Sequence, residues 1–274
     1  MLAYRILSGL VLGAVALLAI FVMPNWLFAL IAIAFIALGL YEFFTLIEKK
    51  GIPIYKYFGI LIGIMIPVSI YFKFEPTKGW ELFFIVAACL GLFLAQFTRR
   101  ENSQAIVGVS TTLFGIVYVS WFFSFMIKLK FAQDMSASIN GSNLVLFLLL
   151  VTKVGDMGAY FIGSFIGKHS LIARISPKKS VEGALGGLII SVLTAYLAKG
   201  LLPAKIPAYH FLILGVSLGI LGQIGDLSES LIKRDCQVKD SGYLVPGMGG
   251  ILDVMDSILF TAPIFYFYMR FLLP

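Results

Sequence analysis

Apolar segments near the length that a helix needs to cross a bilayer, about 20 residues, repeat along the whole chain and constrain its fold more than any other feature. They lie at roughly 7–22, 26–46, 57–72, 80–97, 105–127, 143–167, 184–201, 208–225 and 251–272. Because 60% of the 274 residues are hydrophobic and only 13% are charged, we exclude a soluble fold. The connections are short, so we predict an all-α polytopic membrane protein: one domain over residues 1–274 with about nine transmembrane helices.

Basic residues are divided unevenly between the two ends of these segments. If the N-terminus and the even-numbered loops share a side, that side carries thirteen: Arg5, Lys49, Lys50, Lys56, Arg99, Arg100, Lys168, Arg174, Lys178, Lys179, Lys233, Arg234 and Lys239. The other side carries seven: Lys73, Lys78, Lys128, Lys130, Lys199, Lys205 and Arg270. Because basic residues favour the cytoplasmic side, we predict a cytoplasmic N-terminus. In a protein of the cell's inner membrane, the polar segments 153–183 and 226–256 then face the cytoplasm.

Six of the fourteen carboxylates are concentrated between residues 226 and 256, in an otherwise very apolar chain: Asp226, Glu229, Asp235, Asp240, Asp253 and Asp256. They alternate with Lys233, Arg234 and Lys239. Acids and bases beside a membrane suit metal ions that hold a polyphosphate, with cations neutralising the remaining charge. A solvated loop between two helices is the alternative interpretation.

The spacing of these acids predicts two polar helix faces. If the helix of segment 208–225 continues, one face carries Asp226, Glu229, Ser230 and Lys233. Asp253 and Asp256 lie one turn apart, just after the glycine-rich turn at residues 246–250. Two helices that each bring an acid to the membrane surface can chelate Mg²⁺, and the amides of Gly249 and Gly250 can receive phosphate. Turn geometry and helix packing explain the glycines equally well.

A second polar segment precedes the first. Lys153 and Asp156 lie one turn apart inside an apolar segment, where a structural ion pair and a catalytic role both remain open. Farther along come Lys178, Lys179, Ser180 and Glu182, whose cations and hydroxyl suit a phosphate-binding loop. An ordinary basic cytoplasmic loop is the alternative. A P-loop, a nucleophile elbow and a Rossmann glycine pattern are all missing from the sequence, which disfavours hydrolase and redox chemistry.

Two blocks of residues, in a fixed order, carry a family resemblance. The later block comprises Ser230 to Arg234, Lys239 to Gly242, Pro246 to Gly250, Asp253 and Asp256. The earlier block comprises Asp156, Ala159-Tyr160, Gly163, Gly167-Lys168, Ser176 to Ser180 and Glu182-Gly183. Together they resemble the bacterial phosphatidate cytidylyltransferases, also called CDP-diacylglycerol synthases. Met248, Val254 and Val245 depart from the usual pattern, in which His, Arg and a bulkier residue are common.

The resemblance implies that CTP and phosphatidic acid react to give CDP-diacylglycerol and pyrophosphate, in a catalytic portion at about 143–274. It implies that Asp226 and Asp253 bind Mg²⁺, with Asp240 and Asp256 nearby. Attack by an anionic phosphate needs charge neutralisation and alignment more than a strong base. We therefore predict that Lys233, Arg234 and Lys239 neutralise the negative charge of the substrate phosphates. The predicted substrate-binding set is Lys178, Lys179, Ser180, Glu182, Ser230, Gly249 and Gly250.

Two other functions and several partners follow from the same residues. A CTP-dependent polyprenol-type lipid kinase would use similar helices but transfer the γ-phosphate, and an ion-coupled transporter would place Lys153, Asp156 and Asp226 near polar cavities. Anionic membrane lipids account for the net charge of +7, so no nucleic acid is expected. Glycine faces at residues 59–63 and 163–167 suggest a homodimer.

Overall fold

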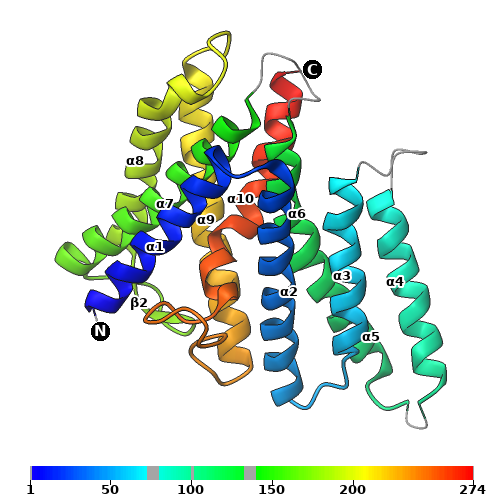
Figure 1. Ribbon diagram of the computed structural model, residues 1–274. Coiled ribbons are helices and arrows are strands. Elements are labelled where there is room, and N and C mark those ends of the chain that lie inside the picture. The colour runs from blue at the N-terminus through cyan, green and yellow to red at the C-terminus, as the bar shows by residue number, and fades with distance from the viewer. Residues whose placement is uncertain (1, 73–79, 100–101, 133–139, 274) are drawn as a thin grey trace. The chain divides into compact units, whose positions relative to one another are not determined.

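Helices make up most of the computed structural model, which describes residues 2–72, 80–99, 102–132 and 140–273 (Figure 1). They are α1 (Leu2–Phe21), α2 (Asn25–Lys49), α3 (Lys56–Tyr71), α4 (Trp80–Phe97), α5 (Ala105–Gly115), α6 (Phe122–Lys130), α7 (Gly141–Ile166), α8 (Val181–Leu197), α9 (Tyr209–Asp235) and α10 (Ile251–Leu272). A π-helical segment, η1 (Ile116–Trp121), joins α5 to α6, and a 3-10 turn, η3 (Ala198–Leu201), follows α8. Within the described ranges the strands are β1 (Ser170–Ile172) and β2 (Ser176–Ser180), an antiparallel pair.

The predicted all-α polytopic membrane protein is confirmed. Among the described residues, seven helical segments are long and apolar enough to cross a bilayer, and two shorter apolar helices lie at Leu7–Phe21 and Lys56–Tyr71. The segment Ala105–Lys130 runs through η1 as one span. The count of nine spans and the cytoplasmic N-terminus stay predictions. Of the basic residues in the charge count, Lys73, Lys78 and Arg100 lie outside the described residues.

The chain divides into two compact units. The first contains residues 1–127 and 235–255, and the second contains residues 128–234 and 256–274. Helix α10 is continuous, with its first turn in the first unit and the rest in the second. The single domain over residues 1–274, with its catalytic portion at about 143–274, stays a prediction.

In the first unit, glycines let α3 pack closely against α2. A Cβ at Gly59 would lie 2.7 Å from the ring of Phe44, and one at Gly63 would collide with Leu40. The hydroxyl of Ser120, in η1, donates a hydrogen bond of 2.5 Å to the carbonyl of Gly63. Packing within the chain therefore occupies the glycines at 59–63, and they no longer support the predicted homodimer.

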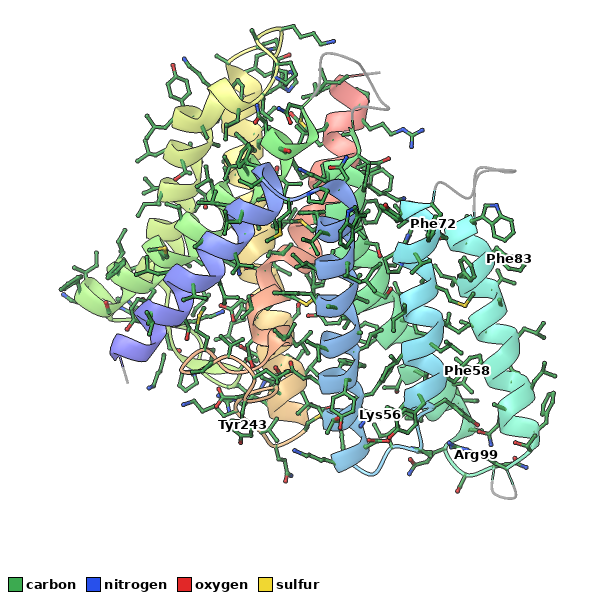
Figure 2. All side chains as sticks on the ribbon, in the orientation of Figure 1. Lys56, Phe58, Phe72, Phe83, Arg99 and Tyr243 are labelled. Carbon is green, nitrogen blue, oxygen red and sulfur yellow. The ribbon has the colours of Figure 1, made fainter. Side chains whose placement is uncertain are left out.

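Several connections of the first unit meet at one end of its helices. Figure 2 shows Lys56 and Arg99 at the same end of α3 and α4. The Arg99 guanidinium donates to the carbonyls of Pro53 and Ile54, at 2.8 and 3.1 Å. Lys50, just after α2, forms an ion pair with Asp235 at the end of α9. The α2–α3 connection, the end of α4 and the start of the segment 235–250 thus share one side, as the even-numbered loops were predicted to do.

In the second unit, small residues again set the helix spacing. A Cβ at Gly155 of α7 would collide with the Ser191 hydroxyl of α8, and one at Gly215 of α9 would lie 2.5 Å from the backbone of Val192. A stacked aromatic pair, Phe147 with Phe265, joins α7 to α10 at 5.5 Å between ring centroids. Close backbone approach and interlocked side chains are what hold helices together in lipid, where burial of apolar surface gives little.

The second predicted glycine face is also filled from within the chain. A Cβ at Gly163 would lie 3.1 Å from the Ser180 hydroxyl, and one at Gly167 would lie 2.5 Å from it. Both glycines therefore let the β1–β2 hairpin and the start of α8 approach the end of α7. The homodimer stays a prediction with no support from these two faces.

Candidate active site

Helix α9 extends past the apolar segment to Asp235, as the spacing of its polar residues predicted. Its last turn carries Lys233 and Arg234, cations that interact favourably with the negative end of the helix dipole. Glu229 is 0% exposed and forms an ion pair with Lys233 one turn later. Two of the predicted site residues of this helix, Ser230 and Asp226, are half-buried.

A cluster of charges lies inside the second unit, between α7 and α10. The ammonium of Lys153 lies 2.8 Å from the hydroxyl of Ser257, 3.7 Å from Asp156 Oδ2 and 3.8 Å from Asp256 Oδ1. The Ser257 hydroxyl in turn donates to Asp156 Oδ2 at 2.8 Å. An ion pair between Lys153 and Asp156, one of the two interpretations left open by the sequence, is therefore present, and it includes a second carboxylate that the sequence spacing did not indicate. We call Lys153, Asp156, Asp256 and Ser257 the internal charge cluster.

Helix α9 brings a further carboxylate to this unit. Asp226 Oδ2 lies 2.5 Å from the ammonium of Lys179, the cation at the fourth position of β2. A Cβ at Gly222 would lie 3.8 Å from both Asp156 and Ser257, so α9 passes directly beside the internal charge cluster. At Gly225, a Cβ would collide with the carbonyl of Asp256. The glycines of α9 thus form a packing face that places Asp226 close to α7 and α10.

The donor atoms of the second unit are suited to a hard cation. Asp156, Asp226 and Asp256 supply carboxylate oxygens, and the ammonium groups of Lys153 and Lys179 lie against them. Magnesium takes one or two carboxylates and completes its shell with water and phosphate oxygens, so these oxygens fit it. Across the described ranges of the chain, His, Cys, Asp and Glu side chains form no group of three or more that would hold a metal by itself.

In the first unit, Asp253 lies at the start of α10 and is held by several donors. Its Oδ2 accepts hydrogen bonds from the Ser241 amide at 2.9 Å, the Ser241 hydroxyl at 2.7 Å and the Gly250 amide at 2.7 Å. Gly249 has φ +106°, a backbone conformation that residues with a side chain rarely adopt. A Cβ there would lie 2.5 Å from the same oxygen of Asp253. The glycine-rich turn therefore serves to bring backbone donors to Asp253.

Glu42 is the residue of this site that the sequence interpretation missed. It lies in α2 and is 5% exposed. Its Oε1 accepts from the Ile251 amide at 3.0 Å, and its Oε2 accepts from the Leu252 amide at 2.9 Å. The Ser241 hydroxyl lies 3.1 Å from the same Oε2. A carboxylate inside a long apolar segment was the available signal, because such residues are costly in a membrane.

The predicted phosphate-binding loop is an ordered hairpin. Ser180 caps α8, with its hydroxyl accepting from the Gly183 amide at 3.1 Å. Glu182 accepts from the amides of Lys168 and His169, and its other oxygen lies 2.6 Å from the His169 ring. Both side chains therefore help to shape the hairpin, whereas Lys178 is exposed on it. Their predicted contact with substrate stays a prediction.

The remaining predicted residues lie in the last turn of α9 and in the segment that leads to α10. Arg234 donates to the Ile175 carbonyl at 3.3 Å, which ties this helix to the β1–β2 hairpin. Lys239 and Asp240 are exposed in the segment that leads to α10. Met248, which departs from the family pattern, is 39% exposed on the same segment, and Val254 is half-buried in α10.

Comparison with known proteins gives this arrangement a family. Residues 3–272 match the sequence model of the cytidylyltransferase family. The chain belongs to that family. A phosphatidate cytidylyltransferase of Synechocystis sp. is 33% identical over 98% of the chain and 97% of the relative. The phosphatidate cytidylyltransferase of Bacillus subtilis is 30% identical over 97% and 96%, and that of Haemophilus influenzae is 30% identical over the full length of both.

Proposed function

We propose that this chain is a phosphatidate cytidylyltransferase, which transfers CMP from CTP to phosphatidic acid and thereby forms CDP-diacylglycerol and pyrophosphate in phospholipid synthesis. The observation that carries this proposal is the extent of the similarity. Three relatives that bear this name align with nearly the whole chain, from the first apolar segment to the last. The similarity therefore includes both units and is not confined to one motif.

In this reaction, a phosphate oxygen of phosphatidic acid attacks the α-phosphorus of CTP. The bond from that phosphorus to the bridging oxygen breaks, and the electron pair leaves with pyrophosphate. The attacking phosphomonoester is already an anion, so no side chain has to remove a proton. The chain's task is to neutralise and align two highly charged reactants at a membrane surface.

We propose Asp226 and Asp253 as ligands of Mg²⁺, with Asp256 and Asp240 as further acids of the catalytic centre. Bound Mg²⁺ would neutralise the triphosphate and stabilise the leaving pyrophosphate. The oxygen donors of these side chains are of the type that Mg²⁺ prefers. Asp226 forms an ion pair with Lys179. On substrate binding this pair would separate: Mg²⁺ would then pair with the Asp226 carboxylate, and a substrate phosphate with the Lys179 ammonium.

Cations and hydrogen-bond donors complete the proposed site. The proposed role of Lys233, Arg234 and Lys239 is to neutralise the negative charge of the substrate phosphates or of the leaving pyrophosphate. A second set is assigned to substrate binding: Lys178, Lys179, Ser180, Glu182, Ser230, Gly249 and Gly250. The acyl chains of phosphatidic acid need no polar recognition and can stay in the bilayer while the headgroup reaches these residues.

We further propose that the protein lies in the cytoplasmic membrane and that its active site faces the cytoplasm, where CTP and Mg²⁺ are found. The excess of basic residues on the side of the even-numbered loops supports this orientation. The ion pair between Lys50 and Asp235 agrees with it, because it joins two segments that were both assigned to that side.

The decisive experiment follows the atoms of CTP. Purified protein receives Mg²⁺, phosphatidic acid and CTP labelled at either the α- or the γ-phosphorus, and the lipid product is identified by mass. We expect α-label in the lipid and γ-label in pyrophosphate. Label from the γ-phosphorus in the lipid would instead make the chain a lipid kinase. Passage of phosphatidic acid or an ion across a bilayer, with neither label in lipid, would make it a transporter.

A further inference from the structure

Glu42 is an acid buried in a membrane-spanning helix, far in sequence from every residue assigned to the reaction. An ionisable side chain at such a position is costly unless specific contacts compensate for the lost hydration. The contacts of Glu42 are unusually directed. Both of its oxygens accept amides from the first two residues of α10, Ile251 and Leu252. These amides belong to the first helical turn, where no carbonyl of the same helix is available to them.

The same carboxylate also reaches the donors of Asp253. The Ser241 hydroxyl lies 3.1 Å from Glu42 Oε2 and 2.7 Å from Asp253 Oδ2. A Cβ on Gly250, whose amide is another donor to Asp253, would collide with the Glu42 carboxylate. A Cβ on Gly242, the residue directly after Ser241, would also collide with the Glu42 carboxylate. Glu42 therefore contacts both residues that donate to Asp253.

We propose that Glu42 is a positioning residue for Asp253. It fixes the start of α10 and the backbone around Ser241, and these groups hold Oδ2 of Asp253 and so set the direction of its other oxygen. The identity of the cation that Asp253 meets, Mg²⁺, rests on the proposed function. The positioning itself rests on the hydrogen bonds of the first unit alone.

The test compares three substitutions in α2. Glu42→Gln keeps the size but turns an amide group toward a backbone N–H, and Glu42→Ala removes both acceptors. Glu48→Gln is the matched control, because Glu48 lies in the same helix and pairs with Lys56 at 3.0 Å. Groups that orient metal ligands typically contribute about 10- to 100-fold to metal affinity or activity. We expect that loss in Glu42→Gln, expressed as a higher Mg²⁺ requirement, and no comparable change in Glu48→Gln.

Two further measurements need no turnover. Binding of Mn²⁺ to the purified protein, followed by electron paramagnetic resonance without substrates, should weaken about 10-fold or more in both Glu42 variants. Hydrogen exchange in peptides covering residues 248–258 should accelerate in these variants and stay unchanged in Glu48→Gln. Faster exchange with unchanged Mn²⁺ binding and an unchanged Mg²⁺ requirement would reduce Glu42 to a helix cap and overturn the proposal.

Two safeguards keep the result interpretable. If both Glu42 variants aggregate, Ser241→Ala removes the hydroxyl between the two carboxylates and should weaken Mn²⁺ binding in the same direction. Unchanged binding in Ser241→Ala would then count against the proposal. If the unaltered protein forms no CDP-diacylglycerol, the proposed function fails, while Mn²⁺ binding and hydrogen exchange still decide whether Glu42 positions Asp253.

Discussion

The buried ion pair of α9 allows the structural and catalytic roles of Lys233 to be separated. Glu229 is 0% exposed and Lys233 is 9% exposed, and they pair one turn apart near the end of the helix. From the sequence, Lys233 was predicted to neutralise the charge of a substrate phosphate. In the structure its ammonium contacts a buried carboxylate, so Lys233→Met removes a charge that also stabilises the fold.

The expected cost of this substitution follows from the burial of the pair. Two unit charges about 4 Å apart attract by about 4 kcal/mol at an effective dielectric constant of about 20, and so little exposure leaves little solvent screening. Removing one partner of a buried pair costs about 3–5 kcal/mol, because the other charge stays buried. We therefore expect Lys233→Met and Glu229→Leu each to lower the free energy of unfolding by about 3–5 kcal/mol.

Replacing both partners should restore most of that stability. Apolar residues that replace a whole buried pair are often neutral, so the double variant Glu229→Leu, Lys233→Met should unfold near the unaltered protein, far from the loss expected by adding the two single variants. Unfolding by sodium dodecyl sulfate in mixed micelles, followed by circular dichroism, measures it. The exposed pair of Lys50 and Asp235 is the control, where Lys50→Met should cost about 1 kcal/mol or less.

Activity of the folded double variant then gives the role of Lys233. If Lys233 neutralises a substrate phosphate, the double variant is stable and nearly inactive. Recovery of both stability and turnover would remove Lys233 from the catalytic set. If Lys233→Met alone unfolded at the same detergent fraction as the unaltered protein, the buried charge of Glu229 would carry no such cost.

Three further predictions concern the acids, the turn and the orientation. Asp226→Asn and Asp253→Asn should each abolish turnover and leave expression and melting temperature normal, because the amide keeps the size of the side chain and loses its charge. Activity near that of the unaltered protein, at saturating Mg²⁺, would exclude the substituted residue as a ligand. Gly249→Ala should reduce activity far more than Gly51→Ala, because both glycines have positive φ but only Gly249 faces a carboxylate; equal losses would make backbone strain the sole cause. Tyr243→Cys, in a variant that lacks Cys89 and Cys236, should be labelled by an impermeant thiol reagent in inside-out vesicles and not in spheroplasts. The reverse pattern would show that the predicted topology is inverted.

The choice of Tyr243 for labelling comes from the structure. Cys236, the native thiol in the same segment, is 7% exposed, and burial raises the pKa of its thiol, with the charge of Asp235 adding to the effect. A buried thiol with a raised pKa reacts slowly, so its failure to label would say nothing about the side on which it lies. Tyr243 is 91% exposed and avoids this ambiguity (Figure 2).

The sequence predicted the features that depend on local periodicity. Apolar runs located the helices, and the polar spacing after Gly225 was consistent with a helix that continues to Lys233, because a helix repeats its face every three to four residues. The glycine-rich turn before Ile251 likewise marked the start of α10. These predictions needed only neighbours along the chain.

Contacts between distant residues escaped the same reasoning. Glu42 bonds to amides about two hundred positions later, and Lys153 bonds to Ser257 across more than a hundred. The β1–β2 hairpin was expected as a loop, because strands of only three and five residues leave little pattern in the sequence. A charged residue inside an apolar run indicates that a partner exists, but its identity is decided by tertiary packing.

The two acids at the start of α10 show why neighbouring carboxylates of one helix need not share a role. Asp253 Oδ2 is held by the amides of Ser241 and Gly250 and by a hydroxyl, donors that carry no formal charge. These bonds fix the direction of the carboxylate, which suits a ligand for a cation. Asp256, one turn later, has the ammonium of Lys153 3.8 Å away, so much of its charge is already compensated. Loss of Asp253 should therefore weaken Mn²⁺ binding more than loss of Asp256, which should mainly disturb Lys153 and the helices around it.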